Sequence, residues 1–175
     1  MTVRATLLVA VLVAVGLAAG PYPPLPANLE RAAIDHVNDG DTVVVRMRGR
    51  KERVRLIGVD CPELHDSPKL DRQLERGRET RAAIVARGAK ASAFTERALA
   101  GRDVLLEYDV DRRDRHGRRL AYVWLSDGTL FNGELLREGW ARVLTIPPNV
   151  RYSDLFIQLQ RDARKAGRGL WARQD

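Results

Sequence analysis

Short runs of apolar and β-branched residues recur through the middle of the chain and favour β-strands. The first three runs cover residues 32–38, 42–47 and 54–59. The segment MRGRK supplies a glycine turn between the second and third runs. Residues 104–108 and 120–125 repeat the pattern on either side of a charged turn, DVDRRDRHGRR. The pattern therefore predicts five strands, of which the first three form a meander.

Elsewhere the apolar spacing is that of helices. Residues 89–101, 132–138 and 153–167 are the helical segments, and Asn132 and Ser153 are predicted as caps of the second and third. The chain beyond the last helix contains a tryptophan, which is expected to pack back onto the domain. We therefore expect about three helices.

A long polar excursion lies ahead of the first of these helices. It covers residues 64–88, and its middle, 71–86, is expected to be partly helical. The excursion is rich in arginine, and dense arginine in such a segment is usually solvated. We favour the interpretation that its arginines are solvated surface residues. The alternative is that they make additional phosphate contacts; these arginines are Arg72, Arg76, Arg78 and Arg81.

This order of elements predicts the fold. Five strands, one helix between the third and fourth and two after the fifth, fit an α+β domain built on a five-stranded oligonucleotide-binding (OB-fold) β-barrel. A sandwich needs more strands, and a doubly wound sheet needs a regular strand and helix alternation that this chain lacks.

Composition adds a class of partner to this fold. The 175 residues, 45% of them hydrophobic, suffice for one domain with a substantial core. Lys and Arg number 30 against 23 Asp and Glu, a net charge of +7 at pH 7. A basic surface suits a polyanion such as nucleic acid or an anionic membrane, and solubility alone is the alternative.

The amino terminus predicts export. Residues 1–20 combine a basic start, an apolar run and small residues at the end, as in a signal peptide. An uncleaved anchor is the alternative, which would tether an extracytoplasmic domain to the membrane. Residues 21–30 are proline-rich and predict an extended linker. Residues 31–175 form the expected domain, which is secreted, periplasmic or at the cell surface.

Two carboxylates frame the second and third strands. Asp41 opens one strand and Asp60 closes the next, so antiparallel pairing across the Gly49 hairpin brings them together opposite the turn. Two such charges repel one another unless a cation lies between them. Calcium or magnesium prefers oxygen ligands of this kind. The carbonyl of Cys61, whose direction Pro62 restricts, is a third candidate ligand, and the thiol is expected to be a small buried group.

Two arginines complete the pattern. Strict alternation places Arg55 and Asp60 on opposite faces of a strand, since they are five residues apart. A bulge at Gly58 would bring both toward one site. Arg118 supplies a second basic group just ahead of the last strand. Taken singly, each arginine is more typical of solvated surface.

Six pieces of the chain together resemble the staphylococcal nuclease, or thermonuclease-like, family. They are VNDGDTVVV, VRLIGVDCPE, ASAFT, DRHGRRLAYVW, FNGELLREGWARV and GLW, in order from about residue 34 to residue 172. The resemblance covers most of the chain beyond the leader, and its specificity lies in the combination.

The resemblance implies an OB-fold nuclease domain that hydrolyses DNA and RNA with calcium, for which manganese or magnesium are possible substitutes. No obligate protein partner is implied, and a monomer is expected. A noncatalytic nucleic-acid-binding module, tethered to a membrane if the leader is uncleaved, is the alternative. The implied metal ligands are Asp41, Asp60 and the Cys61 carbonyl, with Asp39 as a nearby supporting acid; the implied catalytic residues are Arg55, Glu63 and Arg118.

The chain also departs from the family pattern. Where the family carries aromatic residues that stack on the nucleotide, this chain is interpreted as carrying His116, Thr145 and Pro147. Cys61 stands where a threonine is usual beside the metal aspartate. Base preference is therefore the property that the resemblance predicts least well, because a stacking platform contributes roughly 1–3 kcal/mol.

Overall fold

The structure is a computed structural model that describes residues 21–64, 70–71, 74 and 80–172. The predicted leader and the arginines at positions 72, 76 and 78 lie outside the described residues.

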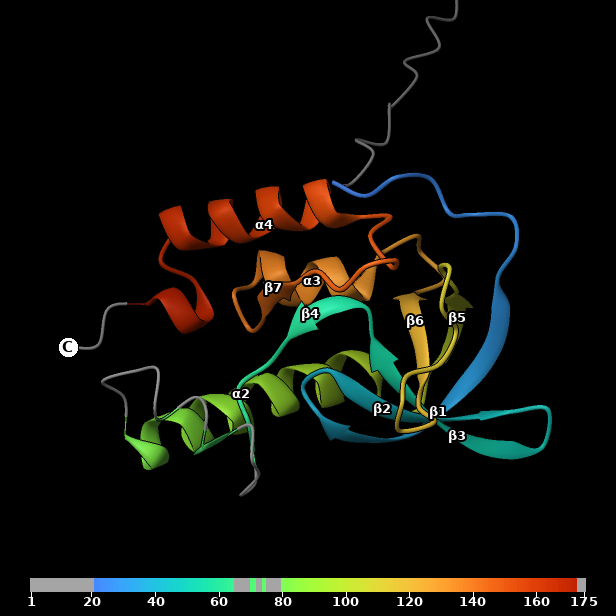
Figure 1. The fold of residues 1–175 in the computed structure, drawn as a ribbon, viewed down its shortest axis with the longest axis horizontal. Helices are drawn as coiled ribbons and strands as arrows, with labels where there is room; N and C mark the ends of the chain where they lie inside the picture. Colours follow the sequence, from blue (N-terminus) through green and yellow to red (C-terminus); the bar gives the residue numbers. More distant parts are fainter. Residues whose placement is uncertain (1–20, 65–69, 72–73, 75–79, 173–175) are drawn as a thin grey trace, which may run out of the picture.

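A closed five-stranded barrel forms the centre of the domain, so the predicted OB-like fold is confirmed (Figure 1). Each strand pairs antiparallel with its neighbours except β3 and β6, which run parallel. Around the barrel the order is β1 (Glu30–Asp39), β2 (Thr42–Met47), β3 (Arg50–Leu56), β6 (Arg119–Trp124) and β5 (Asp103–Glu107).

Alternating apolar residues of these strands fill the barrel, as the sequence pattern predicts. Val43, Val45, Val54, Leu56 and Leu106 are almost completely buried and belong to one continuous core. Their removal from water is the main favourable contribution to folding.

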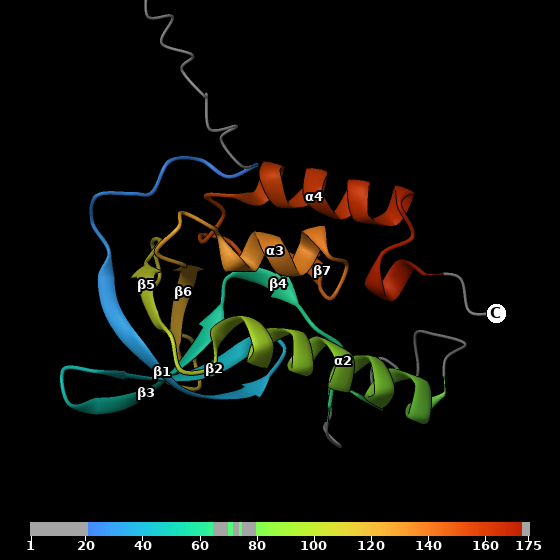
Figure 2. The ribbon, with the colours of Figure 1, turned by 180° about the vertical axis from the view of Figure 1, so that it is seen from behind.

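Three α-helices and a 3-10 turn complete the described part of the chain, in agreement with the predicted number. They are α2 (Arg81–Leu99), α3 (Phe131–Arg137), α4 (Ser153–Lys165) and η1 (Gly169–Trp171). In Figures 1 and 2, α2 lies along one side of the barrel, and α3 lies between the barrel and α4.

Two details of the predicted helices are wrong. Helix α2 starts at Arg81, where the Thr80 side chain accepts a hydrogen bond from the Ala83 amide and caps the helix. The predicted start at 89 is therefore wrong, whereas the expectation that residues 71–86 are partly helical agrees with α2. Asn132 and Ser153 lie inside their helices, whose N-cap positions are Leu130 and Tyr152.

The third predicted strand, 54–59, is two strands. β3 ends at Leu56, and β4 (Gly58–Asp60) leaves the barrel to pair with β7 (Arg142–Leu144), a strand that the sequence pattern did not predict. Gly58 has a φ of +81°, a conformation that side-chain-bearing residues rarely adopt. The chain therefore turns at this point, where the sequence predicted a bulge within one strand.

Both ends of the described chain pack on the α3 and α4 side. The Tyr22 ring lies against Gly133, and its hydroxyl donates a hydrogen bond to Glu134 over 2.5 Å. Trp171 packs back as predicted, with the guanidinium of Arg164 4.3 Å from its ring centre. In the described part of the chain, no helix has the length and apolarity that crossing a membrane requires.

Candidate active site

The side chains of Asp41, Asp60 and Arg55 meet at one end of the β2–β3 pair. The Arg55 guanidinium lies 3.0 Å from an Asp41 carboxylate oxygen and 3.3 Å from one of Asp60. Because one planar group touches both acids, the two carboxylates converge on a single point. These three residues, which the sequence proposed as parts of one site, are thus neighbours in space.

Strand pairing places Asp41 beside Arg55, whereas the chain turn after β3 delivers Asp60. Thr42 pairs with Arg55 across the β2–β3 ladder, and the Leu56 amide donates to the Asp41 carbonyl over 2.9 Å. The turn at Gly58 then carries β4 across the end of the barrel. The hairpin alone, on which the sequence argument relied, does not bring Asp60 to the site.

Asn132 stabilises this turn from the interior of the protein. Its side-chain amide is buried, donates to the Ile57 carbonyl over 2.8 Å and accepts from the Val123 amide over 2.8 Å. A peptide group at a strand break lacks its ladder partner, and leaving it unpaired in the interior costs free energy. The residue that the sequence suggested as a helix cap therefore satisfies backbone groups behind the candidate site.

Asp41 is 4% exposed and is held by the backbone on both sides. Its amide donates to Asp39 over 3.0 Å, and its carboxylate accepts from the Cys61 amide over 2.7 Å. The neighbouring Gly40 carbonyl accepts from the Thr95 hydroxyl of α2 over 2.7 Å. Helix α2, through Thr95, and the backbone amide of Cys61 thus fix the β1–β2 turn that carries Asp39 and Asp41.

Cys61 is a packed side chain. It is 2% exposed, and a Cβ added at Gly40 would lie 2.7 Å from its sulfur. The thiol is therefore buried against the β1–β2 turn, as expected for a small apolar group, while its backbone amide binds Asp41.

The crowded charges shift two pKa values. Burial, and then the charge of Asp41, raise the pKa of Asp39 from 3.8 to about 6. Burial disfavours the charged form of Arg55, but the Asp41 and Asp60 carboxylates outweigh it and raise the pKa of the guanidinium. The site therefore favours positive charge at the point between its acids.

The two acids that converge here, Asp41 and Asp60, offer carboxylate oxygens, the type of donor that a hard cation prefers. Among the residues that the structure describes, no group of three or more His, Cys, Asp and Glu is arranged to hold a metal. Asp41 and Asp60 supply two convergent carboxylates, and calcium and magnesium accept carbonyl and water oxygens as the remaining ligands. The point between the Asp41 and Asp60 carboxylates, where the Arg55 guanidinium lies, also favours a metal cation electrostatically.

The other two candidate catalytic residues lie on chain segments next to the strands of this cluster: Glu63 lies three residues after β4, and Arg118 directly precedes β6. Arg118 is held by Asp114, to which its Nε donates over 2.7 Å, and it lies two residues before Leu120, the β6 partner of Arg55. Glu63 follows Asp60 closely, and its carbonyl lies so near α2 that a Cβ at Gly88 would overlap it. The roles proposed for both residues stay predictions.

A surface beside β4 was not foreseen from the sequence. Leu144, 39% exposed, pairs with Gly58, and Ile146, 62% exposed, follows it two residues later. Thr145 and Pro147, which stand where the family is interpreted as carrying stacking aromatic residues, alternate along the chain with these two apolar side chains. Alternation in the run LTIP was the only signal available, and the run is too short to predict a strand.

The chain is similar to a family of known proteins over most of its described length. The sequence model of the family described as staphylococcal nuclease homologue matches residues 53–173. That range includes Arg55, Asp60, Glu63 and Arg118 and begins after Asp41.

Several individual proteins are similar over most of the chain. A thermonuclease of Staphylococcus intermedius is 40% identical over 156 residues, covering 88% of this chain and 84% of that protein. A thermonuclease of Staphylococcus hyicus is 36% identical, covering 83% and 78%. Endonuclease YncB of Bacillus subtilis is 31% identical, covering 87% and 67%.

Proposed function

Because this chain belongs to the staphylococcal nuclease family, we propose that it is a calcium-dependent endonuclease that hydrolyses phosphodiester bonds of DNA and RNA with little sequence specificity. The names of its relatives, thermonuclease and endonuclease, support the reaction class. The observation that carries the proposal is the contact of one guanidinium, that of Arg55, with both Asp41 and Asp60.

In this proposal the acids hold the metal ion. Asp41 and Asp60 supply carboxylate oxygens, Cys61 supplies its carbonyl, and Asp39 supports Asp41 through the hydrogen bond from the Asp41 amide. A calcium ion bound there supplies positive charge against the non-bridging phosphate oxygens. Manganese or magnesium are possible substitutes because they also accept oxygen ligands.

The arginines and Glu63 act on the phosphate and on water. Arg55 and Arg118 donate from planar guanidinium groups to phosphate oxygens and stabilise the charge that grows during in-line attack. Asp114 orients Arg118 for this task. Glu63 positions or deprotonates the attacking water.

The apolar pair Leu144 and Ile146 contributes to the binding of the substrate base. Exposed apolar side chains next to β4 offer a base a surface to pack on without hydrogen bonds that would select its identity. Aliphatic side chains stack less well than aromatic rings, so we expect weak affinity for a single nucleotide.

The decisive experiment measures degradation of plasmid DNA and of RNA with calcium and with EDTA. We expect cleavage with calcium and none with EDTA. Glu63→Gln and Arg118→Ala should each reduce the cleavage rate by on the order of 10² to 10³ while the protein stays folded. Arg161→Ala, a change at an exposed position of α4, is the matched control and should cleave like the parent.

Binding of nucleic acid without metal-dependent cleavage would favour the alternative, a noncatalytic binding module. Unchanged rates in both site variants would show that the assigned residues are wrong.

We also propose that the protein is exported and monomeric. The basic start, apolar run and small residues of positions 1–20 support export. Determination of the amino terminus of the protein recovered from culture medium tests this, and a chain that starts at Met1 in a membrane fraction would support the anchored alternative.

A further inference from the structure

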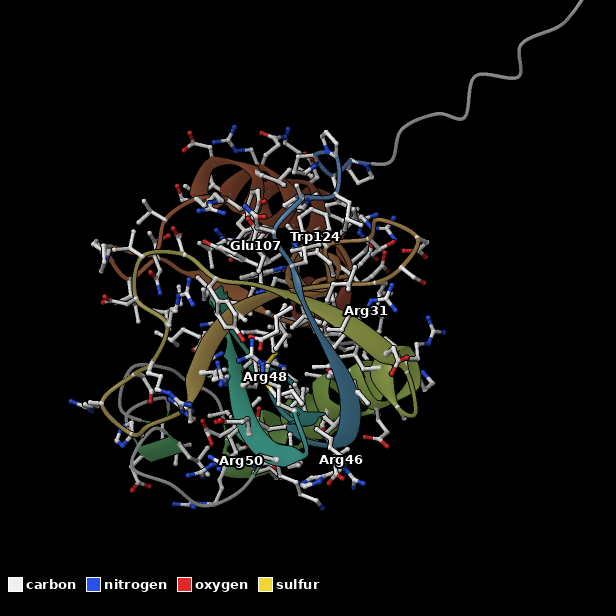
Figure 3. All side chains as sticks on the ribbon, turned by 90° about the vertical axis from the view of Figure 1, so that its right-hand side faces the viewer. Arg31, Arg46, Arg48, Arg50, Glu107 and Trp124 are labelled. Atoms are coloured by element: carbon white, nitrogen blue, oxygen red, sulfur yellow. The ribbon has the colours of Figure 1, made fainter. Side chains whose placement is uncertain are left out.

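The β2–β3 hairpin carries an unusual density of cations at the end of the barrel remote from the candidate site. Between positions 46 and 53 it has five cationic side chains and one carboxylate. Figure 3 looks onto this end, with Arg46, Arg48 and Arg50 gathered around the hairpin and Arg31 on the neighbouring strand β1.

Three of these cations form ion pairs with carboxylates of β1. Arg46 and Lys51 both bind Asp35, at 2.6 Å and 2.7 Å, and Arg48 binds Glu30 at 2.9 Å. Such pairs fix the positions of long side chains that would otherwise be mobile. The group of Arg46, Lys51 and Asp35 keeps a net charge of +1, because one carboxylate faces two cations.

Arg50 and Arg53 are different. Both are exposed, and no ion pair or hydrogen bond within the described residues involves either side chain. Folding gains nothing from these two guanidinium groups through contacts, so an external anion is free to bind them.

The strand geometry aligns these cations with the candidate site. Lys51, Arg53 and Arg55 are two residues apart on β3, so they share its outer face. Arg50 begins β3 at the hairpin tip and, by the same alternation, lies on the other face, opposite Met47. Their spacing is about 7 Å, and the row extends about 14 Å along the strand. This spacing is comparable with that of successive phosphates on an extended single strand. The row begins at Arg55, whose guanidinium touches both acids of the candidate site.

We propose that the outer face of the β2–β3 hairpin, together with the exposed Arg50 at its tip, is a binding surface for the phosphate backbone of a nucleic-acid strand, which it guides away from the cleavage site toward the hairpin tip. The inference rests on the proposed function for the identity of the polyanion. A row of cations in line with a phosphodiester site fits a strand better than a membrane, which would contact a broad face.

The test removes the two unpaired arginines together. Arg50→Ala with Arg53→Ala strips no ion pair, so the thermal midpoint should not change. Arg161→Ala with Lys165→Ala on α4 removes the same charge from exposed positions of another layer and is the matched control. Binding is measured in EDTA, by fluorescence anisotropy, for a dinucleotide and for a single-stranded oligonucleotide that spans the hairpin.

We expect the hairpin variant to bind the long strand about tenfold more weakly near physiological salt, with the slope of log affinity against log salt concentration reduced by about 1.4, the value for two lost phosphate contacts. Affinity for the dinucleotide should be unchanged, and the α4 control should match the parent. Equal affinity of parent and hairpin variant for the long strand overturns the inference. Binding to phosphatidylglycerol vesicles is measured as well. A hairpin variant that binds these vesicles more weakly but binds the long strand like the parent also overturns the inference.

A separate assay keeps this inference distinct from the proposed function. Calcium-dependent cleavage of a dinucleotide substrate is measured with the same proteins. If the parent cleaves nothing but the hairpin variant binds the long strand more weakly, the proposed function fails and the binding surface stands. If the parent cleaves the dinucleotide but parent and hairpin variant bind the long strand alike, the proposed function stands and the binding surface fails.

Discussion

At the residue scale, the candidate site is a balance between buried acids and one arginine. Asp41 is almost completely buried and Asp39 lies next to it, so ionisation of both is unfavourable without a nearby cation. Arg55 supplies positive charge to Asp41 and Asp60. A bound metal would share this task, and the affinity for it should depend on the ionisation of Asp39.

This leads to a prediction on pH. Because the pKa of Asp39 is raised from 3.8 to about 6, its contribution to stability is fully present below 3.8 and is lost as the pH rises through about 6. A divalent cation favours the ionised form. We therefore expect calcium to raise the thermal midpoint more at pH 7 than at pH 5, as measured by differential scanning calorimetry.

Asp39→Asn is the control for the pH experiment, because it removes the titrating group and should bring the calcium-induced shifts at the two pH values closer together. An equal calcium shift at both pH values in the parent would contradict the assignment of Asp39 as a supporting acid.

At the element scale, the break between β3 and β4 decides the geometry of the site. Gly58 combines a positive φ with close packing, since an added Cβ would lie 2.5 Å from the Phe156 ring of α4. The turn directs Asp60 toward Arg55, and pairing with β7 fixes the direction of β4. A short strand outside the barrel thereby positions one of the two proposed carboxylate ligands.

Gly58→Ala should therefore destabilise the protein and weaken calcium binding. We expect a loss of about 2–4 kcal/mol in the free energy of unfolding, from backbone strain together with overpacking against Phe156. Urea denaturation measures the stability, and calcium titration of the folded variant measures the effect on the site.

Gly128→Ala separates the two causes. Gly128 has a similar φ of +85°, but an added Cβ there meets nothing within 4 Å. This control should lose only about 1–2 kcal/mol and bind calcium like the parent. Equal losses in the two variants would show that contact with Phe156 is unimportant.

At the scale of the whole molecule, the barrel and the α3–α4 layer are joined behind the site. The β4–β7 pair and the buried Asn132 make this connection, and the carboxyl-terminal turn closes the far side of the layer. Trp171 lies against the guanidinium groups of Arg164 and Arg142, at 4.3 Å and 5.5 Å from its ring centre. The Leu170 amide donates to the Gly139 carbonyl over 2.8 Å and ties this turn to the chain after α3.

Trp171→Ala should lower stability without changing the chemistry. Loss of the ring removes apolar packing and two cation–π contacts, so we expect roughly 1–3 kcal/mol less free energy of unfolding. Thermal denaturation measures this loss, and the cleavage rate at low temperature should match that of the parent.

Val110→Ala, at a side chain that is 68% exposed, is the control and should change stability by no more than about 0.5 kcal/mol. A Trp171 variant that keeps its stability but loses cleavage would show that the carboxyl-terminal turn contributes to the site instead of to packing.

Much of the fold is determined by local sequence signals. β2, β5 and β6 are short runs of apolar and β-branched residues, and most positions of each run are buried in the structure. The helical segments were found from their apolar spacing. Family membership also followed from the chain alone, because the motifs that carry it are contiguous.

Other features depend on contacts between distant segments and had no local signal. Gly88 argues against a helix by its propensity, yet it lies inside α2, where the Glu63 carbonyl approaches so closely that any Cβ would overlap it. β7 is only three residues long and exists because β4 pairs with it. Asn132 resembles a cap by its type, but serves the carbonyl of Ile57, 75 residues away.

The barrel, the number of helices, the family and the grouping of Asp41, Arg55 and Asp60 could all be predicted from the amino-acid sequence. The way in which these residues meet follows from contacts between distant segments: the chain turns at Gly58, β4 crosses to β7, and Arg55 lies between Asp41 and Asp60. The physical reason is that periodicity records which face of an element is buried, whereas the direction of a chain after a strand break depends on what packs against it.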